Sequence, residues 1–358
     1  MARFFEYQGK KFLKDAGIAI PNGEVASTAK EAYEIATRIG KPVVVKAQVW
    51  AGGRGKAGAI KSADTPEEAE KVASAILGME VKGFPVRKVL VEEKLNINKE
   101  YYVGVIPDSS WTSRAPVVMF STEGGMDIEQ VPEDKIFRAK VDYLKGFPLY
   151  DALDLASSAG IPNELLRQMA GVISNTVTVF KKCDCNILEI NPLILTQEGK
   201  LVAGDCRMAM DDSASFRHPE LGIAIPREFP WEPTDFDMVG WGIEETDFRG
   251  SGFVMKMTLD ETSPGYIGFH AIGGGAAMIG IDALSRVGLK PANFADTSGN
   301  PVASKIYRVA KVVLSQPNIE GYLLAGFLIA NQEQWHHAHA IVKAFKAVSY
   351  THLTLPTN

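Results

Sequence analysis

The N-terminal part of the chain shows the two periodicities that distinguish helices from strands. Apolar side chains recur with helical spacing in residues 6–16, 28–39 and 65–76, and the β-branched run 43–45 is typical of a buried strand. Gly40 follows the second helical segment, where glycine commonly ends a helix. These helices and strands predict one small α/β unit.

The middle of the chain favours strands, one long helix and a hairpin. Its predicted elements are strands at residues 89–93, 100–106 and 116–120, and a helix at 163–180 that Asn163 would cap. Residues 186–191 and 201–205 flank the sequence Gln197-Glu198-Gly199-Lys200, which is typical of a β-hairpin turn. We therefore expect residues 1–225 to form one mixed α/β domain.

The C-terminal part begins with weak periodicity and continues with a regular alternation. Residues 226–260 are rich in Pro, Trp, Phe and acids, and are expected to form a linker with one edge strand at 252–258. From Tyr266 onward the order βαβαβα predicts a flavodoxin- or Rossmann-like parallel sheet with right-handed crossovers, over residues 261–347. The final sequence SYTHLTLPTN lacks caps and periodicity and resembles a translated sequencing adapter. Residues 348–358 are therefore expected to be a non-native tail on a truncated second domain.

Composition restricts the class of protein and its partners. The 358 residues are 46% hydrophobic and 23% charged, which is ordinary for a soluble globular protein of two or three domains. A net charge of −5 argues against a nucleic-acid partner, and no apolar run reaches membrane-spanning length. The N-terminus lacks the apolar core of a signal peptide, and three cysteines form no disulfide framework. A reducing cytoplasm is therefore the expected compartment.

A basic glycine-rich stretch, residues 42–61, offers the first candidate site. Its strand ends at Lys46, and the loop that follows contains Gly53, Arg54 and Gly55. Glycines let a backbone approach a ligand closely, and successive N–H groups beside cations bind phosphate oxygens. The stretch matches neither GxxxxGK[ST] nor GxGxxG. By itself, it supports a phosphate-binding loop and a solvated surface hairpin equally.

The predicted hairpin brings polar side chains to one face. If its turn centres on Glu198, Asn191 lies opposite Asp205. By the same symmetry Glu189 lies opposite Arg207, and all four side chains share one face. Two or three oxygen ligands on one face suit Mg²⁺, which takes its other ligands from water and nucleotide phosphates. The alternative from the residues alone is an ordinary polar hairpin face with a Glu189–Arg207 pair.

A second glycine-rich site is expected in the C-terminal domain. The buried strand 266–272 is followed by Gly273-Gly274-Gly275 and a helix, an arrangement that binds anions at the helix N-terminus. Ligands of parallel α/β sheets bind at the carboxyl ends of the strands. The expected ligand loops of this domain are therefore residues 273–275 and 327–331.

Five short motifs are spread over nearly the whole chain. They are FEYQGK (5–10), VVKAQVWAGGRGKAG (44–58), STEGGMDIE (121–129), LEINPL (188–193) and PANF (291–294). Their sequences and their order resemble those of succinyl-CoA synthetase β subunits, which are ATP-grasp proteins. The resemblance implies an ATP-grasp domain followed by a CoA-ligase domain.

The resemblance also implies roles for residues at matching positions. Those expected to bind ATP or GTP are Lys46, Gly53, Arg54 and Gly55 at the phosphates, and Glu92, Leu95 and Glu100 at the nucleoside. Leu95 would act through its backbone. Asn191 and Asp205 match the family's Mg²⁺ ligands in residue type and spacing. Glu189 matches an acid near the transferring phosphate, and with Arg207 opposite it forms the candidate catalytic pair.

A reaction and a partner are implied as well. In this family the β subunit packs on an α-type subunit, which binds CoA and carries a transiently phosphorylated histidine. The expected reaction converts ATP, succinate and CoA into succinyl-CoA, ADP and phosphate.

Two loops favour citrate as the alternative acid. Gly273-Gly274-Gly275-Ala276 and Ile329-Ala330-Asn331 depart from the succinate enzymes and resemble ATP citrate lyase and citryl-CoA synthetase. More distant alternatives are a nucleotide-binding subunit without ligase activity, and an ATP-grasp ligase for another acceptor such as an amine.

Overall fold

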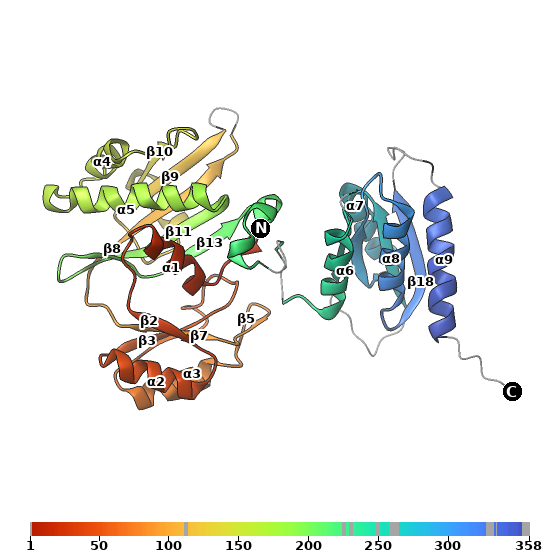
Figure 1. The fold of residues 1–358 in the computed structure, drawn as a ribbon, viewed down its shortest axis with the longest axis horizontal. Coiled ribbons are helices and arrows are strands. Elements are labelled where there is room, and N and C mark those ends of the chain that lie inside the picture. Colours follow the sequence, from red (N-terminus) through yellow and green to blue (C-terminus); the bar gives the residue numbers. More distant parts are fainter. Residues whose placement is uncertain are drawn as a thin grey trace. The chain divides into compact units, whose positions relative to one another are not determined.

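The computed structural model describes most of the chain, which divides into two compact units (Figure 1). The described residues are 2–110, 114–223, 227–228, 232–247, 249, 251–257, 265–326, 333 and 335–352. One unit is Met1–Glu232 and the other is Pro233–Asn358, so the division falls within the segment expected to be a linker. No helix among the described residues combines the length and hydropathy that crossing a membrane requires.

The first part of the N-terminal unit is a four-stranded sheet covered by two helices. Its strands lie in the order β2 (Gly23–Ala26), β7 (Val89–Glu93), β3 (Val43–Ala47) and β4 (Ile60–Ala63). Helices α2 (Ala29–Ile39) and α3 (Pro66–Ile76) pack on it, and a short ladder of β5 (Glu80–Val81) and β6 (Phe84–Pro85) follows. The predicted small α/β unit is confirmed.

Local sequence signals set the ends of these helices. Thr28 accepts a hydrogen bond from the Glu31 N–H at the start of α2, and Gly40 ends that helix in the left-handed region at φ 64°. Thr65 caps α3 in the same way by accepting from the Glu68 N–H.

The remainder of this unit is built on a seven-stranded sheet. The strand order is β1 (Ala2–Arg3), β13 (Arg207–Met210), β11 (Cys185–Thr196), β8 (Ile97–Asp108), β9 (Ala115–Ser121) and β10 (Ile136–Lys140), with β12 (Leu201–Ala203) paired to β11. The helices of this part are α1 (Glu6–Asp15), α4 (Leu149–Ser158) and α5 (Asn163–Lys182). Helix α5 begins at Asn163, but Pro162 occupies the N-cap position that the sequence assigned to Asn163.

The predicted hairpin is present with its predicted register. Strands β11 and β12 pair antiparallel, with Leu193 opposite Ala203. Strands β11 and β13 continue the same register, with Glu189 opposite Arg207. Between these two pairs the register places Asn191 opposite Asp205, in the short break that separates β12 from β13.

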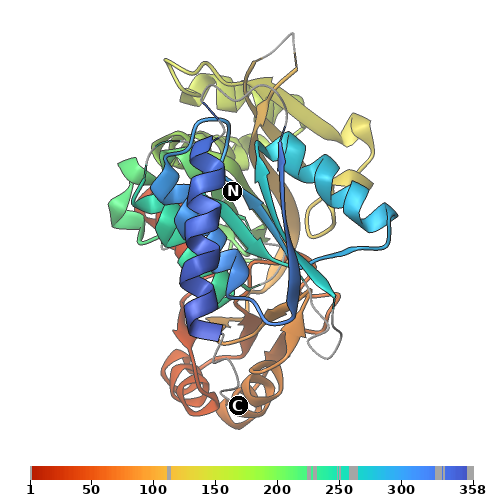
Figure 2. The same cartoon turned by 90° about the vertical axis from the view of Figure 1, so that its right-hand side faces the viewer.

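The second unit contains a five-stranded sheet. Its central strand β15 (Tyr266–Ile272) pairs in parallel with β16 (Lys290–Pro291), β17 (Asn293–Asp296) and β18 (Ile319–Gly326), and β14 (Phe253–Lys256) pairs antiparallel with β17. Helix α7 (Gly274–Arg286) covers one face, and α8 (Ala303–Leu314) and α9 (Trp335–His352) cover the other (Figure 2). The parallel α/β arrangement is confirmed, and α9 extends past residue 348, where periodicity was expected to end.

The segment expected to be a linker with one edge strand contains a helix that the pattern did not predict. Helix α6 (Asp235–Glu245) begins with a reciprocal cap between Thr234 and Asp237. Gly240 lets α6 lie close to β14, because a Cβ at this position would be only 2.7 Å from the Cβ of Val254. The buried face of α6 includes Asp237 and Gly240, so its apolar periodicity is weak in the sequence. The predicted edge strand corresponds to β14.

Candidate active site

The glycine-rich loop connects β3 to β4, as predicted. Gly53 and Gly58 have φ values of 77° and 71°, which residues with a Cβ rarely adopt. Gly53 and Gly55 are exposed, whereas Arg54 between them is only 9% exposed. The loop therefore combines accessible backbone with one cation directed into the protein.

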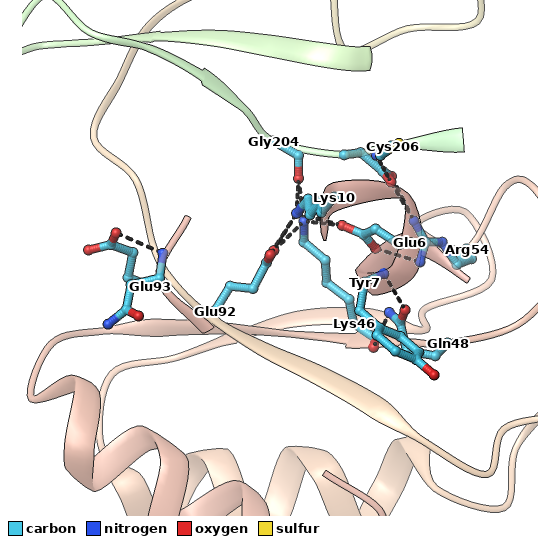
Figure 3. A network of polar contacts seen from close by, with 12 residues as sticks. Glu6, Tyr7, Lys10, Lys46, Gln48, Arg54, Glu92, Glu93, Gly204 and Cys206 are labelled. Atoms are coloured by element: carbon cyan, nitrogen blue, oxygen red, sulfur yellow. Dashed lines mark hydrogen bonds and ion pairs between the residues drawn. The ribbon is translucent and has the colours of Figure 1, made fainter. Parts of the chain in front are cut away.

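Six charged side chains meet in one largely buried network beside this loop, part of which is drawn in Figure 3. They are Glu6 and Lys10 of α1, Lys46 of β3, Arg54 of the loop, Glu92 of β7, and Asp205 between β12 and β13. Lys46 and Glu92 belong to the four-stranded sheet, and Asp205 belongs to the hairpin of the seven-stranded sheet. The network therefore joins the two sheets of the N-terminal unit.

Lys46 has three acceptors in this network. Its Nζ lies 2.9 Å from Glu6 and 2.9 Å from Glu92, and it donates to the Gly204 carbonyl oxygen at 2.6 Å. Burial alone would lower the pKa of Lys46, but the neighbouring carboxylates outweigh burial and raise it above its ordinary value. Lys46 is therefore a permanently charged cation beside the loop.

Arg54 bridges two carboxylates. One of its terminal nitrogens donates to Glu6 at 2.7 Å, and the other donates to both oxygens of Asp205 at 2.8 and 2.7 Å. Burial opposes the charged form, yet the two carboxylates raise the pKa of Arg54. Burial would likewise raise the pKa of Glu6, but Lys10 and the other cations hold it well below its ordinary value.

Asn191 contacts a different segment, the turn after β9. Its side-chain oxygen accepts from the Gly125 N–H at 2.8 Å, and its side-chain nitrogen donates to the Met126 carbonyl at 2.9 Å. The Glu100 carboxylate lies beside the same turn, next to Gly125. The turn therefore holds Asn191, which is expected to bind metal, and lies beside Glu100, which is expected to bind the nucleoside.

Glu189 has its own pair of partners. Tyr102 of β8 donates a hydrogen bond to one carboxylate oxygen at 2.8 Å, and Arg207 lies 3.1 Å from the other oxygen. Tyr102 is fully buried, and burial raises the pKa of its phenol, which therefore remains a donor. Gly104 provides the space for this contact, because a Cβ there would collide with the Tyr102 hydroxyl.

The predicted site residues fall into three groups. One group is the buried network, which contains Lys46, Arg54, Glu92 and Asp205. The other two are Glu100 and Asn191, which both lie at the Gly125 turn, and the Glu189–Arg207 ion pair on the hairpin. Leu95 is half-buried just beyond β7.

Sequence reasoning assigned no role to Glu6, Lys10 or Tyr102. Glu6 and Lys10 lie four residues apart and therefore on one face of α1, and they form an ion pair at 2.8 Å. That spacing, within the FEYQGK motif, is the signal that could have indicated them. Tyr102 carries no comparable signal, since it lies in a predominantly apolar stretch of β8.

The glycine-rich loop of the second unit lies at the carboxyl end of β15, as predicted. Gly273 has a φ of 106°, and its N–H donates to Asp296 at 2.8 Å. Gly274 and Gly275 then form the first residues of α7. The other predicted residues of this site, Ile329, Ala330 and Asn331, lie outside the described residues.

Comparison with known proteins identifies the class and then the family. The family model described as "ATP-grasp domain" matches residues 3–195, so the chain is an ATP-grasp protein. It is 41% identical over 324 residues to the succinate–CoA ligase [GDP-forming] subunit beta of Thermus thermophilus, covering 89% of this chain and 80% of that protein. It is 42% identical over 323 residues to the succinate–CoA ligase [ADP-forming] subunit beta 1 of Archaeoglobus fulgidus, covering 88% and 79%. The chain belongs to the family of succinate–CoA ligase β subunits.

A solved structure has the same fold. ATP citrate lyase from Methanothrix soehngenii, in complex with citrate and coenzyme A, matches with a TM-score of 0.76 and 21% identity. The match covers 98% of this chain and 86% of that chain. The expected fold class, an ATP-grasp domain followed by a parallel α/β CoA-ligase domain, is confirmed.

Proposed function

We propose that this chain is the β-type subunit of a nucleoside-diphosphate-forming succinate–CoA ligase. The proposed reaction converts ATP or GTP, succinate and CoA into succinyl-CoA, the nucleoside diphosphate and phosphate. The observation that supports it most directly is the ion-pair network that brings Lys46, Arg54 and Asp205 together beside an exposed glycine loop. The relatives named above are ADP- or GDP-forming ligases of succinate and CoA.

The two cations are suited to binding nucleotide phosphates. Lys46 and Arg54 remain charged, and the exposed Gly53 and Gly55 can bring backbone N–H groups to phosphate oxygens. The nucleoside would lie against Glu92, Glu100 and the Leu95 backbone. In the structure, Glu92 is paired with Lys10 and Lys46, so its contact with a nucleoside requires the pair with Lys46 to open.

Asn191 and Asp205 would hold Mg²⁺. Both offer oxygen ligands, and the hairpin register places them opposite each other. No group of three or more His, Cys, Asp or Glu side chains suited to a metal is found in the described part of the chain. A two-residue oxygen site suits Mg²⁺ because this ion keeps several waters and shares phosphate oxygens. When bound, it would neutralise charge on the phosphates during phosphoryl transfer.

The transfer would involve a partner. An α-type subunit would bind CoA and present the histidine that accepts the phosphoryl group, and Glu189 and Arg207 would lie near the transferring phosphate. The loops at Gly273–Gly275 and residues 329–331 would contact the phosphate or the acid. The three cysteines are all buried and free, which fits a reducing, cytoplasmic setting.

Citrate is the second candidate acid. The sequence Gly273-Gly274-Gly275-Ala276 favours it, as does Ile329-Ala330-Asn331, because both depart from the pattern of succinate enzymes. The nucleotide and metal residues are the same for both acids.

Reconstitution with the cognate α-type subunit tests the proposal. The assay measures nucleoside diphosphate release with CoA and Mg²⁺, comparing succinate with citrate and ATP with GTP. Succinate-dependent release is the expected result. Release with citrate alone would favour the second candidate, and no release with either acid would contradict the proposed function.

A further inference from the structure

Two lysines of the buried network share the same three acceptors. Lys46 contacts Glu6, Glu92 and the Gly204 carbonyl oxygen at 2.9, 2.9 and 2.6 Å. Lys10 contacts the same groups at 2.8, 2.7 and 2.9 Å. The proposed function uses Lys46 and Glu92 but leaves Lys10 without a role.

The two lysines differ in burial. The Lys46 side chain is 12% exposed, whereas that of Lys10 is 2% exposed. Lys46 is the penultimate residue of β3, the strand that leads into the glycine-rich loop, while Lys10 is fixed within α1. Lys46 is therefore the lysine that can turn toward a nucleotide, and Lys10 is the one that stays.

Turning Lys46 toward a phosphate has an electrostatic consequence. Glu6 and Glu92 are 3% and 2% exposed, and a buried carboxylate that loses its partner is strongly destabilising. Lys10 prevents that loss, because it already donates to both oxygens of Glu92 at 2.7 Å and contacts Glu6. No acceptor of Lys46 is left without a cation when Lys46 moves.

We infer that Lys10 is a positioning residue, which holds Glu6, Glu92 and the Gly204 carbonyl in place while Lys46 moves to the nucleotide phosphates. This inference rests on the proposed function. The alternative is a purely structural ion-pair network, in which both lysines are needed for folding and neither exchanges partners.

Calorimetric titration of the full chain with ADP and Mg²⁺ tests the inference. Lys10→Met should weaken ADP binding about tenfold or more, because Lys46 must then remain with the carboxylates. Lys11→Met is the matched control, since Lys11 is the exposed neighbour on the same helix. Lys11→Met should bind ADP with the same affinity as the wild type. A folded Lys10→Met variant that binds ADP like the wild type would overturn the inference.

Thermal unfolding without nucleotide provides the second measurement. Lys46→Met should unfold at the wild-type temperature, because Lys10 still serves every acceptor. Lys10→Met/Lys46→Met should lose far more stability than the two single changes together. If Lys10→Met does not fold, the stability of Lys46→Met alone tests the inference. A Lys46→Met variant that fails to fold would then overturn it. Failure of the wild type and of Lys11→Met to bind ADP would instead contradict the proposed function.

Discussion

Arg54 donates hydrogen bonds to both carboxylate oxygens of Asp205, at 2.8 and 2.7 Å. The proposed function assigns these two residues to different ligands, the nucleotide phosphates and Mg²⁺. In the structure the two side chains are hydrogen-bonded to each other, so the proposed binding of nucleotide and metal would require them to separate. The pair therefore links the proposed phosphate-binding loop of one sheet to the proposed metal-binding hairpin of the other.

Removing the Asp205 carboxylate should abolish phosphoryl transfer without unfolding the chain. Asp205→Ala deletes a proposed metal ligand, and the Asp205 side chain is partly exposed, so little packing is lost. The measurement is phosphorylation of the α-type subunit together with the unfolding temperature. Glu198→Ala, at the exposed turn of the same hairpin, is the control and should remain active. Full activity of Asp205→Ala would contradict the proposal that Asp205 binds Mg²⁺.

Tyr102→Phe should slow phosphoryl transfer while leaving ADP affinity unchanged. The change removes one partly buried hydrogen bond to the Glu189 carboxylate, a type of contact that contributes about 1.5–3 kcal/mol. If that contact orients Glu189 in the transition state, the rate falls about tenfold or more. Rapid-quench measurement of α-subunit phosphorylation gives the rate.

Tyr101→Phe is the matched control for this change. Tyr101 is the neighbouring buried tyrosine on β8, and its ring stacks on Phe120. A Tyr102→Phe rate equal to that of Tyr101→Phe would show that the hydroxyl does not orient Glu189.

Gly53→Ala should weaken nucleotide binding, whereas Gly52→Ala should not. Gly53 has a φ of 77°, and an alanine forced into the left-handed region is strained by ~1 kcal/mol or more. Among the described residues, a Cβ at Gly52 would meet no neighbouring atom within 4 Å, and Gly52 has no positive φ of this kind. Calorimetric titration with ADP and Mg²⁺ measures the nucleotide affinity of the two variants. Equal affinities in both variants would argue against a role for the Gly53 conformation.

Acid should destabilise the second unit below about pH 6.5. His270 is fully buried between Tyr322 and Thr297, and burial lowers its pKa from 6.5 to about 3. Below the unfolded pKa the unfolded chain takes up a proton that the folded chain does not, so stability falls by ~1.4 kcal/mol per pH unit. Burial lowers the pKa of His337 too, which acts in the same direction.

Hydrogen exchange of the β15 amides between pH 7.5 and pH 5 measures this loss. His339→Gln, on the exposed side of α9, is the control and should keep the acid sensitivity. Protection that stays constant over this range, after correction for intrinsic exchange, would contradict the neutral state of His270.

Patterns with a local physical cause could be predicted from the sequence. The Glu189–Arg207 register follows from a turn centred on Glu198, and the helix limits follow from Thr28, Gly40 and Thr65. Each depends on residues close together in the chain. The loop after Lys46 could be predicted for the same local reason, because glycine itself permits backbone conformations that other residues rarely adopt.

Features that depend on tertiary contacts could not be predicted in this way. The ion pairs of Lys10 with Glu92 and of Arg54 with Asp205 join segments far apart in the chain. The sequence motifs contain these residues but do not indicate which of them pair. Helix α6 was missed because Gly240, which is unfavourable in helices, is required there by the close approach of Val254. The contact of Asn191 with the Gly125 turn is also tertiary, and nothing in the sequence indicated it.

The most direct test of the proposed function is phosphoryl transfer from γ-labelled ATP or GTP to the α-type subunit, without CoA or acid. We predict an acid-labile label on an α-subunit histidine, dependent on Mg²⁺ and absent with Lys46→Met in a folded chain. Absence of label with the wild type, or equal labelling with Lys46→Met, would contradict it.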